Sequence, residues 1–540
     1  MSALATQVNQ WLSGLWRYLE LVSASTPITG PVLWNWLTET FRKGISFTSL
    51  SFYLFFPVCL LLFYLLPKVA KNFWLLVCSY LFYYLCTFDN QQKAHPEFLF
   101  LLAAVTLISY FLCIAIDLAE KRGWRRLLLA LVVGIDLSLL IYYKYMGFFA
   151  EVLSGIFPSM IPQDSISTSL FLPVGISFYI FLSIGYAIDV YRKDRPAELN
   201  VINYALFVSF FPQIVSGPIA RSRGLLDELR QSRPYNHALV NEGMRQMLWG
   251  FFKKLVLSNN AAAIVQLVFA TPERFNGFEL FCGSLFFTLQ IYADFSGYSD
   301  MAIGSAKMLG LHLGNNFNRP YFSRSIGEFW DRWHISLSSW FQDYLYIPLG
   351  GSRKGAARAC INVMIVFLLS GLWHGAAYTF IVWGGLHGAY TVLSRLTRGI
   401  RKWLRGVTRI ERAKPVHALL QWVPTFLFVN FAWIFFRADS LKNAFTFFYR
   451  FPIDFTINIT DAVSRQNSLR NIGFYQNNGP ALLWCTLALF IVEAICYKTP
   501  PEKLSGRLPF ILRLVLVYAL LLAVLFFGAF GNSGFIYGAF

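Results

Sequence analysis

A series of long apolar runs, continuing from near residue 48 to near residue 530, constrains the fold of this chain more than any other feature. A helix needs about 20 apolar residues to cross the hydrocarbon core of a bilayer. Runs of that kind lie at roughly 48–66, 72–88, 97–118, 127–149, 170–190, 243–269, 416–436, 480–498 and 511–530. Further apolar segments, each expected to be interrupted, lie at 201–219, 279–311 and 359–397. The pattern predicts an all-α, polytopic transmembrane helical bundle of about 10–12 spans with re-entrant half-helices.

The composition excludes a water-soluble protein and argues against nucleic-acid binding. Hydrophobic residues make up 56% of the 540 residues and charged residues only 14%, which is too little polar surface to cover soluble domains. The formal net charge is +18, and a strongly basic balance is typical of nucleic-acid-binding proteins. Here, however, the Lys and Arg residues fall in short loops between apolar runs, as the positive-inside rule describes. We therefore expect contact with membrane lipid and no nucleic acid.

The charges in the loops also predict an orientation. Four basic stretches are expected on the cytoplasmic side: 68–71, 121–126, 192–195 and 395–414. The segment 151–169 contains no Lys or Arg and is expected outside, as is the polar stretch 438–479. Counting crossings then places both termini outside, provided that 201–219 and 359–397 enter the membrane and return to the cytoplasmic side.

Residues 1–46 differ from the rest of the chain and are expected to form a separate N-terminal unit. Apolar residues recur with helical spacing over 11–22 and again over 33–41. Two amphipathic helices on the membrane surface, or helices packed on the bundle, would both produce this pattern. Because residues 1–10 lack a basic segment followed by an apolar core, no cleavable signal peptide is expected. Residues 47–540 are predicted to form one transmembrane domain.

His374 is the strongest candidate for chemistry among the seven histidines. It lies in the apolar segment LLSGLWHGAA at 368–377, and an ionisable side chain inside such a run marks a functional site by default. The glycines on both sides permit close approach of backbone or substrate. A hydrogen bond between helices is the other interpretation of such a histidine. His387, in the segment GLHG, has a weaker case and is expected to support the site or the packing.

His334 lies in the segment FWDRWHISLS at 329–338, where charges, aromatic rings and hydroxyls alternate. The apolar spacing over 325–345 predicts an amphipathic helix at the cytoplasmic interface. That prediction explains the tryptophans but not the histidine.

Asp294 and Asp300 stand in the apolar run 279–311 and are expected to interrupt it. Buried carboxylates must be paired or hydrogen-bonded, and three arginines are candidate partners: Arg319, Arg324 and Arg332. The chain has no nucleotide-binding loop, no H-E-x-x-H motif and no G-x-S-x-G elbow. These absences argue against an ATP-driven pump, a zinc protease and a serine hydrolase, and no metal site is predicted.

Seven ordered motifs resemble the core of bacterial membrane-bound O-acyltransferases of the alginate O-acetylation type. They are LPVGISFY (172–179), FFPQIVSGPI (210–219), DFSGYSDMA (294–302), NRPY (318–321), FWDRWHISLS (329–338), DYLYIPLGG (343–351) and GLWHG (371–375). The resemblance covers roughly residues 47–540. Residues 1–46 depart from the usual pattern, in which the chain starts near the first span.

That resemblance implies a funnel or tunnel through the bundle, with the active site partway across the bacterial cytoplasmic (inner) membrane. It implies that His374 carries catalysis and that His334 is the second catalytic position. The expected donor is acetyl-CoA, bound as a substrate, with no resident cofactor. The expected acceptor is a hydroxyl on an exported polysaccharide, or on a periplasmic or extracellular partner acyltransferase of the SGNH type. The implied process is O-acetylation in exopolysaccharide biosynthesis.

The residue types fit this chemistry. A neutral imidazole is suited to accept the proton of an attacking hydroxyl near neutral pH, so His374 is the predicted general base. A backbone N–H or His334 is predicted to stabilise the oxyanion, and arginines at the cytoplasmic mouth to attract the phosphates of coenzyme A. The residues predicted to bind substrate or donor are Arg319, Arg332, Asp331, Trp373 and Asp294.

Two other functions are compatible with the sequence. A transporter or flippase of a lipid-linked sugar would also have broken helices and charges near the membrane midplane. A non-catalytic scaffold for a polysaccharide-modifying complex would not need His374. The sequence does not name the polysaccharide.

Overall fold

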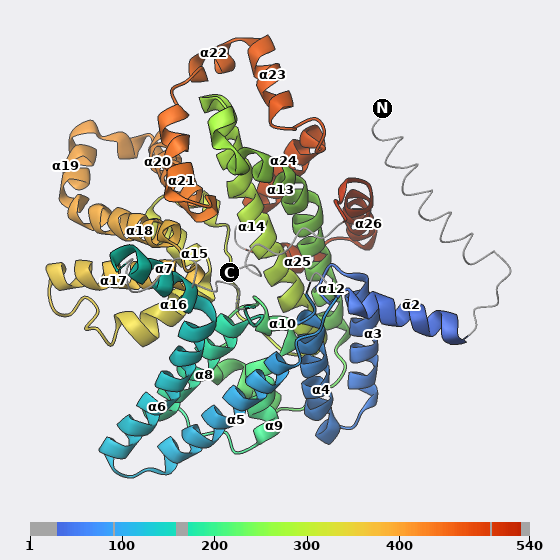
Figure 1. The fold of residues 1–540 in the computed structure, drawn as a ribbon. Coiled ribbons are helices and arrows are strands. Elements are labelled where there is room, and N and C mark those ends of the chain that lie inside the picture. The colour runs from blue at the N-terminus through green and yellow to red at the C-terminus, as the bar shows by residue number, and fades with distance from the viewer. Residues whose placement is uncertain (1–29, 90–91, 158–170, 497–498, 531–540) are drawn as a thin grey trace.

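A computed structural model describes residues 30–89, 92–157, 171–496 and 499–530. Within these ranges the chain is helical and has no strand (Figure 1), which confirms the predicted all-α bundle. The expected helix over 33–41 falls within α2 (Gly30–Arg42). The expected helix over 11–22 lies outside the described residues.

Among the described residues, six helical runs have the length and apolar composition needed to cross a membrane. They are α4 (Lys68–Cys86), α5 (Glu97–Leu118), α6 (Arg122–Leu140) continued by the π-helical η1 (Ile141–Tyr145) and α7 (Met146–Ile156), α17 (Ala356–His374), α20 (Lys414–Arg437) and α26 (Phe510–Phe527). The shorter apolar helices are α3 (Leu50–Leu65), α8 (Ile176–Tyr191), α9 (Val201–Ser209) with α10 (Phe211–Ile214), and α24 (Gly479–Ile495). The protein is therefore a multi-pass membrane bundle.

The remaining helices pack around these runs or connect them. The α-helices are α11 (Ser222–Leu229), α12 (His237–Phe251), α13 (Asn259–Ala270), α14 (Gly277–Met308), α15 (Ile326–Arg332), α16 (Ile335–Phe341), α18 (Tyr378–Leu396), α19 (Arg398–Thr408), α21 (Leu441–Arg450), α22 (Phe455–Thr460), α23 (Ala462–Asn471) and α25 (Pro501–Gly506). Two more segments are π-helical, η3 (Phe252–Ser258) and η6 (Gln342–Tyr346), and three are 3₁₀-helical, η4 (Pro272–Arg274), η5 (Pro320–Phe322) and η7 (Ile410–Arg412).

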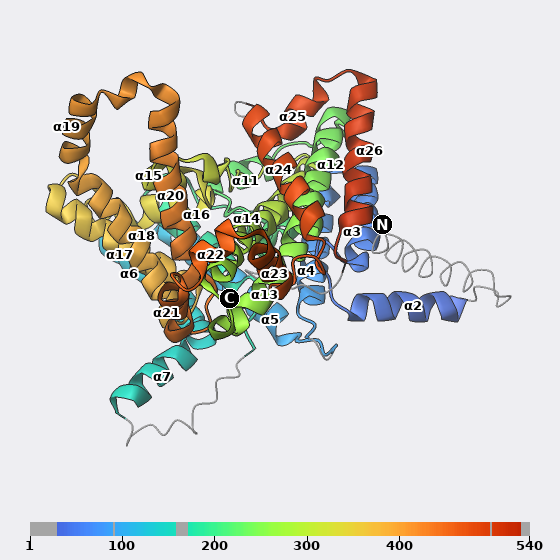
Figure 2. The ribbon, with the colours of Figure 1, turned by 90° about the horizontal axis from the view of Figure 1, so that it is seen from above.

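α14 runs through the middle of the bundle (Figures 1 and 2). It begins with a reciprocal capping box, in which the Asn276 side chain accepts from the Glu279 backbone N–H and the Glu279 side chain accepts from that of Asn276. Most of its 32 residues are buried, and it packs against α12, η3 and α13. The expectation that Asp294 and Asp300 interrupt this run is wrong. The helix continues through both residues, because lysines of η3 pair with their carboxylates.

Two pairs of glycines let α12 and α14 approach closely. A Cβ atom at Gly243 would overlap the backbone oxygen of Gly304, and one at Gly250 would overlap that of Gly297. Small residues at such crossings allow helix backbones to meet in membranes. Gly297, which belongs to the DFSGYSDMA motif, therefore serves helix packing and not a turn.

The segment 325–345 is not the single amphipathic helix that its spacing predicts. α15 and α16 meet in a bend at His334, where φ is +44°, a backbone conformation that few non-glycine residues adopt. Asn316 holds the bend: its backbone oxygen accepts from the Ile335 N–H at 2.9 Å, and its side chain accepts from Ser336 Oγ at 2.6 Å. Local spacing could not reveal the bend, because Asn316 belongs to the loop after α14.

The helix breaks expected near Pro212 and near His374 are present. The first separates α9 from α10 just before Pro212. The second separates α17, which ends at His374, from α18. α17 and α18 pack tightly, because a Cβ atom at Gly371 or at Gly384 would overlap the backbone of the other helix.

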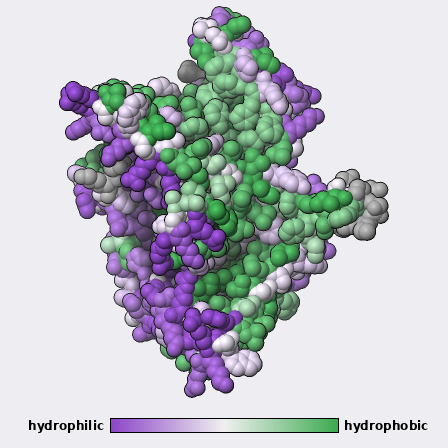
Figure 3. Space-filling view, turned by 90° about the vertical axis from the view of Figure 1, so that its left-hand side faces the viewer, coloured by the Kyte–Doolittle hydropathy of each residue, from purple (hydrophilic) through white to green (hydrophobic). Residues whose placement is uncertain are grey.

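The surface agrees with a membrane location. On the side shown in Figure 3, hydrophobic residues cover the middle of the face, and hydrophilic residues gather along one edge and at the bottom. α19 lies at this side of the bundle (Figure 1) and has no buried residue. A hydrophobic middle with polar margins is the surface that a bilayer favours.

Candidate active site

His374 lies at the end of α17, and only 1% of its surface is exposed. Aromatic rings enclose the imidazole, with ring centroids at 4.9 Å for Trp373, 5.1 Å for Trp383 and 5.5 Å for Phe436. Gly375 follows directly, and a Cβ atom there would overlap a phenylalanine ring of α18. The predicted catalytic histidine therefore stands at the break between two helices, sheltered from bulk water.

His334 reaches the same place from the bend between α15 and α16. Its ring centroid lies 6.1 Å from that of His374 and 4.7 Å from that of Phe295, and its exposure is 0%. A positive φ at a non-glycine residue costs of the order of 1–3 kcal/mol and is found most often at functional sites. The structure thus brings the two predicted catalytic histidines together.

Lys144 anchors the end of α17 beside His374. Its Nζ donates to the backbone oxygen of Trp373 at 2.6 Å and to Ser177 Oγ at 3.2 Å. It lies in η1, and π-helical segments within α-helices are frequent at functional sites. The sequence signal was a lysine inside the apolar run 127–149, but that signal alone did not identify its partners.

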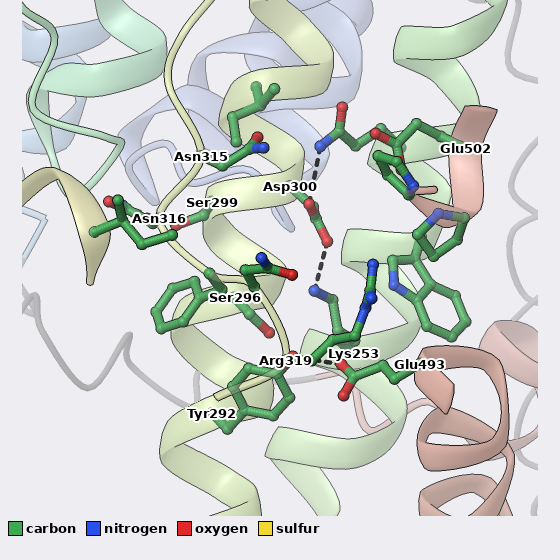
Figure 4. A pocket seen from close by; sticks show the side chains of 18 residues that line it. Lys253, Tyr292, Ser296, Ser299, Asp300, Asn315, Asn316, Arg319, Glu493 and Glu502 are labelled. Carbon is green, nitrogen blue, oxygen red and sulfur yellow. Dashed lines mark hydrogen bonds and ion pairs between the residues drawn. The ribbon is translucent and has the colours of Figure 1, made fainter. Parts of the chain in front are cut away.

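A cavity of about 330 Å³ lies between α14, η3 and the loop after α14 (Figure 4). One wall is the face of α14 that carries Ser296 and Ser299, and another is the loop that carries Asn316. Ile335, the residue after His334, also lines this cavity, whereas neither His334 nor His374 does. The cavity therefore approaches the site from the His334 side.

Charged side chains line the cavity and pair across it. Lys253 Nζ lies 2.5 Å from an Asp300 carboxylate oxygen, and Gln246 Nε2 donates to the other oxygen at 2.9 Å. The Tyr292 hydroxyl donates to the carboxylate of Glu493 (Figure 4). These contacts join α12, η3, α14 and α24 around one polar space within an otherwise apolar bundle.

Arg319 is the one predicted donor-binding arginine that lines this cavity. Its φ is +51°, directly before Pro320. Arg332 instead pairs with Glu328 at 2.7 Å, one turn earlier on α15. Asp331 is exposed, but its carboxyl is incompletely hydrated, and this loss of hydration together with the nearby Glu328 carboxylate raises its pKa. Neither Arg332 nor Asp331 lines the cavity.

Asp294 is fully buried and lies outside the lining of the cavity. Its carboxylate pairs with Lys254 Nζ at 2.5 Å and accepts from Ser258 Oγ at 3.3 Å. The predicted partners of Asp294 were arginines, whereas its partner in the structure is this lysine. Two adjacent lysines inside the apolar run 243–269 could have indicated the partner, because charged side chains within a membrane are usually paired with one another.

His387 lies in the aromatic cluster next to the site. The Trp330 indole N–H donates to its Nδ1 at 3.2 Å. The Trp383 ring lies 5.1 Å from both the His374 ring and the His387 ring, measured between centroids. His387 therefore contributes to the packing around the site.

Comparison with known proteins places the chain among acyltransferases. The family model of the membrane-bound O-acyltransferases matches residues 191–432. A probable alginate O-acetylase of Pseudomonas putida is 42% identical over 400 residues, which are 74% of this chain and 78% of that protein. A peptidoglycan O-acetyltransferase of Helicobacter pylori is 34% identical over 429 residues, covering 74% of this chain and 77% of that protein. A teichoic acid D-alanyltransferase of Bacillus subtilis is 29% identical over 281 residues, covering 50% and 70%.

The matched region carries the features described above. It contains His334, His374 and the whole of α14. The relatives are named as acyl-transferring enzymes, and those above 30% identity cover about three quarters of this chain. The protein therefore belongs to the membrane-bound O-acyltransferase family and is a multi-pass membrane O-acyltransferase.

Proposed function

We propose that the protein moves an acetyl group from cytoplasmic acetyl-CoA to a hydroxyl presented on the outer side of the bacterial cytoplasmic membrane. The acceptor hydroxyl belongs to an exported polysaccharide, or to an SGNH-type partner acyltransferase that passes the acetyl group on. The observation that carries this proposal is the meeting of His334 and His374, whose ring centroids lie 6.1 Å apart at a helix break.

In the proposed reaction the acceptor oxygen attacks the thioester carbonyl carbon while His374 takes the hydroxyl proton. The carbonyl oxygen becomes an oxyanion, and a hydrogen-bond donor from His334 or from the backbone stabilises it. Collapse of this intermediate breaks the carbon–sulfur bond. Coenzyme A leaves as the thiol with the proton returned from His374, and the acetyl ester stays on the acceptor.

Burial of the site supports this chemistry. Both histidines are closed to bulk solvent, with 0% and 1% of their surfaces exposed. Excluding water prevents hydrolysis of the thioester and strengthens the interaction of fixed dipoles with the developing charge. A neutral imidazole is the form that a general base requires.

The cavity that reaches Ile335, next to His334, is the proposed donor site. Arg319 places a guanidinium in its lining beside the Lys253–Asp300 ion pair, and guanidinium groups bind phosphates through charge-assisted hydrogen bonds. In this proposal neither Trp373 nor Asp294 contacts the donor. Trp373 packs against the His374 ring, and Asp294 holds Lys254 in an ion pair. Arg332 and Asp331 lie outside this cavity, so we assign the donor phosphates to Arg319.

The names of the relatives support the proposed acceptor class. Their names describe the acetylation of alginate and peptidoglycan and the D-alanylation of teichoic acid. These acceptors are all surface polymers, so a glycan hydroxyl is the acceptor that we propose here.

The proposal is tested with purified protein in lipid vesicles that receive acetyl-labelled acetyl-CoA. An oligomannuronate fragment serves as the acceptor probe, and a peptidoglycan fragment is used in a second arm. We expect acceptor-dependent release of the coenzyme A thiol and label on a glycan. His374→Ala should slow this release about 10²–10⁴-fold, because it removes the proton acceptor.

His387→Ala is the matched control, since it removes a buried imidazole that lies across Trp383 from the site. It should keep most of the activity if the protein folds. Turnover by His374→Ala at the wild-type rate would contradict the assignment. Glycan movement without thiol release would favour a transporter, and full function of every histidine variant would favour a scaffold.

A further inference from the structure

A large apolar groove lies at the edge of the bundle where α3, α12 and α26 run together (Figures 1 and 2). Its volume is about 1370 Å³, above the ~300–1,000 Å³ typical of small-molecule pockets. Tyr53 and Phe56 line it from α3, and Leu514 and Leu521 line it from α26. The groove shares no lining residue with the cavity of Figure 4.

The groove exists because α26 is attached mainly by its C-terminal end. The Ala529 N–H donates to the Leu255 backbone oxygen at 3.0 Å, and Asn260 Nδ2 donates to the Phe527 oxygen at 2.8 Å. Within α26 itself, Val524 is the buried residue. Toward its N-terminal end the helix borders the open groove, so α12 and α26 face each other across apolar space.

One end of the groove is strongly basic. Four permanent cations line this end: Arg245, Lys503, Arg507 and Arg513. The lining contains one carboxylate, Glu242, which already pairs with Lys307 Nζ at 2.5 Å. Within the part of the chain that the structure describes, none of the four cations forms an ion pair. The positive charge at this end is therefore available to an anion.

Arg245 is held at this end by its surroundings. Its Nε donates to the backbone oxygen of Glu502 at 3.2 Å. Gly506 makes room for the guanidinium, because a Cβ atom there would lie 3.0 Å from its terminal nitrogen. A guanidinium fixed in this way loses little conformational entropy when it binds a phosphate.

We propose that this groove binds an anionic glycerophospholipid, with its phosphate against Arg245, Arg507 and Arg513 and an acyl chain along α26. Lys503 and Arg507 belong to the connection between α24 and α26, and Arg245 of α12 and Arg513 of α26 lie at the same end of the groove. The positive-inside rule places this connection at the cytoplasmic surface. The inner leaflet is the anionic one, and basic side chains at its surface attract its headgroups. A lipid would fill both the basic end and the apolar part of the groove, whereas a soluble phosphate would occupy only the basic end.

The lipid tightens the attachment of α26 by filling the space between it and α12. Its binding is independent of acetyl transfer, because the groove and the histidine pair have no residue in common. Loss of the lipid should therefore lower the stability of the protein before it alters the chemistry.

Native mass spectrometry of the purified full chain tests this inference. The detergent-solubilised protein is titrated with phosphatidylglycerol, with phosphatidylcholine and with inorganic phosphate. The groove variant is Arg245→Gln with Arg507→Gln and Arg513→Gln. The matched control is Arg398→Gln with Lys402→Gln and Arg412→Gln, which removes three exposed charges from α19 and the turn after it.

We expect one phosphatidylglycerol to bind wild type in preference to phosphatidylcholine and to raise the unfolding temperature. The groove variant should bind it about 10²-fold more weakly, because each basic side chain near the surface contributes about 1 kcal/mol to attraction of anionic lipid. The control should bind it like wild type.

A second variant, Val517→Trp, fills the apolar part of the groove and keeps all four cations. It should lose lipid binding as well. The proposal would be overturned if wild type bound the two lipids equally or if the groove variant bound phosphatidylglycerol like wild type. It would also be overturned if the α19 control lost as much binding as the groove variant, or if inorganic phosphate displaced the lipid. Unchanged lipid binding by Val517→Trp would do so too, since it would leave only a surface charge effect.

Discussion

At the scale of single residues, Lys144 links the position of His374 to the rest of the bundle. Its Nζ donates to the backbone oxygen of Trp373 at 2.6 Å, and Trp373 directly precedes His374. Tyr145 adds a second anchor through its hydroxyl, which donates to the Leu372 oxygen at 2.9 Å. The end of α17 is therefore held from η1, and we interpret Lys144 as a positioning residue.

Lys144→Met should lower kcat about 10²-fold, because displacing a reacting group by about 1 Å has an effect of that size. The KM for acetyl-CoA should change little, since Lys144 does not line the proposed donor cavity. Steady-state thiol release measures both constants. Ser177→Ala removes the longer of the two bonds, at 3.2 Å, and should retain most activity. A wild-type kcat in Lys144→Met would remove Lys144 from this role.

His334 combines an imidazole with a backbone conformation that favours glycine or asparagine. His334→Asn and His334→Gly both tolerate its φ of +44°, so both should fold with near wild-type unfolding temperatures. His334→Gly should lose about 10²-fold in kcat if the ring stabilises the oxyanion, and His334→Asn should lose less, because its amide can still donate. Thermal unfolding and kcat are measured on the same samples. A folded, fully active Gly variant would assign His334 a structural role alone.

At the scale of elements, the crossing of α17 and α18 places His374. Gly384 lies against the α17 backbone, and a Cβ atom there would overlap the backbone of Phe367. Gly385, the next residue, has more room, since its nearest neighbour is a Leu368 side-chain carbon at 3.7 Å. The two adjacent glycines thus offer a controlled pair of substitutions.

Gly384→Ala should destabilise the protein by about 1–3 kcal/mol, the usual effect of overpacking, and should lower activity by separating the two helices. Gly385→Ala should be neutral or slightly stabilising, because alanine favours the helix more than glycine does. Unfolding temperature and thiol release in detergent compare the two. Equal effects of both substitutions would show that the crossing does not depend on the close approach at Gly384.

Elements also show where sequence patterns succeed and fail. The break after His374 was predictable, because glycines interrupt an apolar run there. The continuity of α14 was not, because Asp294 and Asp300 resemble breakers until Lys253 and Lys254 are seen to pair with them. The amphipathic spacing over 325–345 predicted one helix, whereas contacts with the preceding loop bend it.

At the scale of the whole molecule, the loop charges predict an orientation that labelling can check. Lys402 in α19 is expected on the cytoplasmic side and Gln466 in α23 on the outer side; both are exposed. Single cysteines replace them in a chain whose eight native cysteines have been substituted. A membrane-impermeant maleimide should label Gln466→Cys in intact spheroplasts and Lys402→Cys only after the membrane is opened. The reverse pattern would invert the orientation and the proposed direction of transfer.

The sequence by itself determined the class of the molecule. Hydropathy and loop charge are properties of consecutive residues, so they predicted a polytopic helical bundle, and the ordered motifs around His334 and His374 indicated the family. A histidine in an apolar run could be recognised as a candidate without any tertiary information. Arg319 could also be named, because it lies in one of those motifs.

Only the tertiary structure decided which residues meet. It placed His334 beside His374, paired Asp294 with Lys254, joined Lys144 to the Trp373 backbone, and lined the cavity with Arg319 but not with Arg332 or Asp331. The three contacts each join segments that are far apart in the chain. The partner of a buried charge depends on how distant helices pack, and the periodicity within either helix carries no information about that packing.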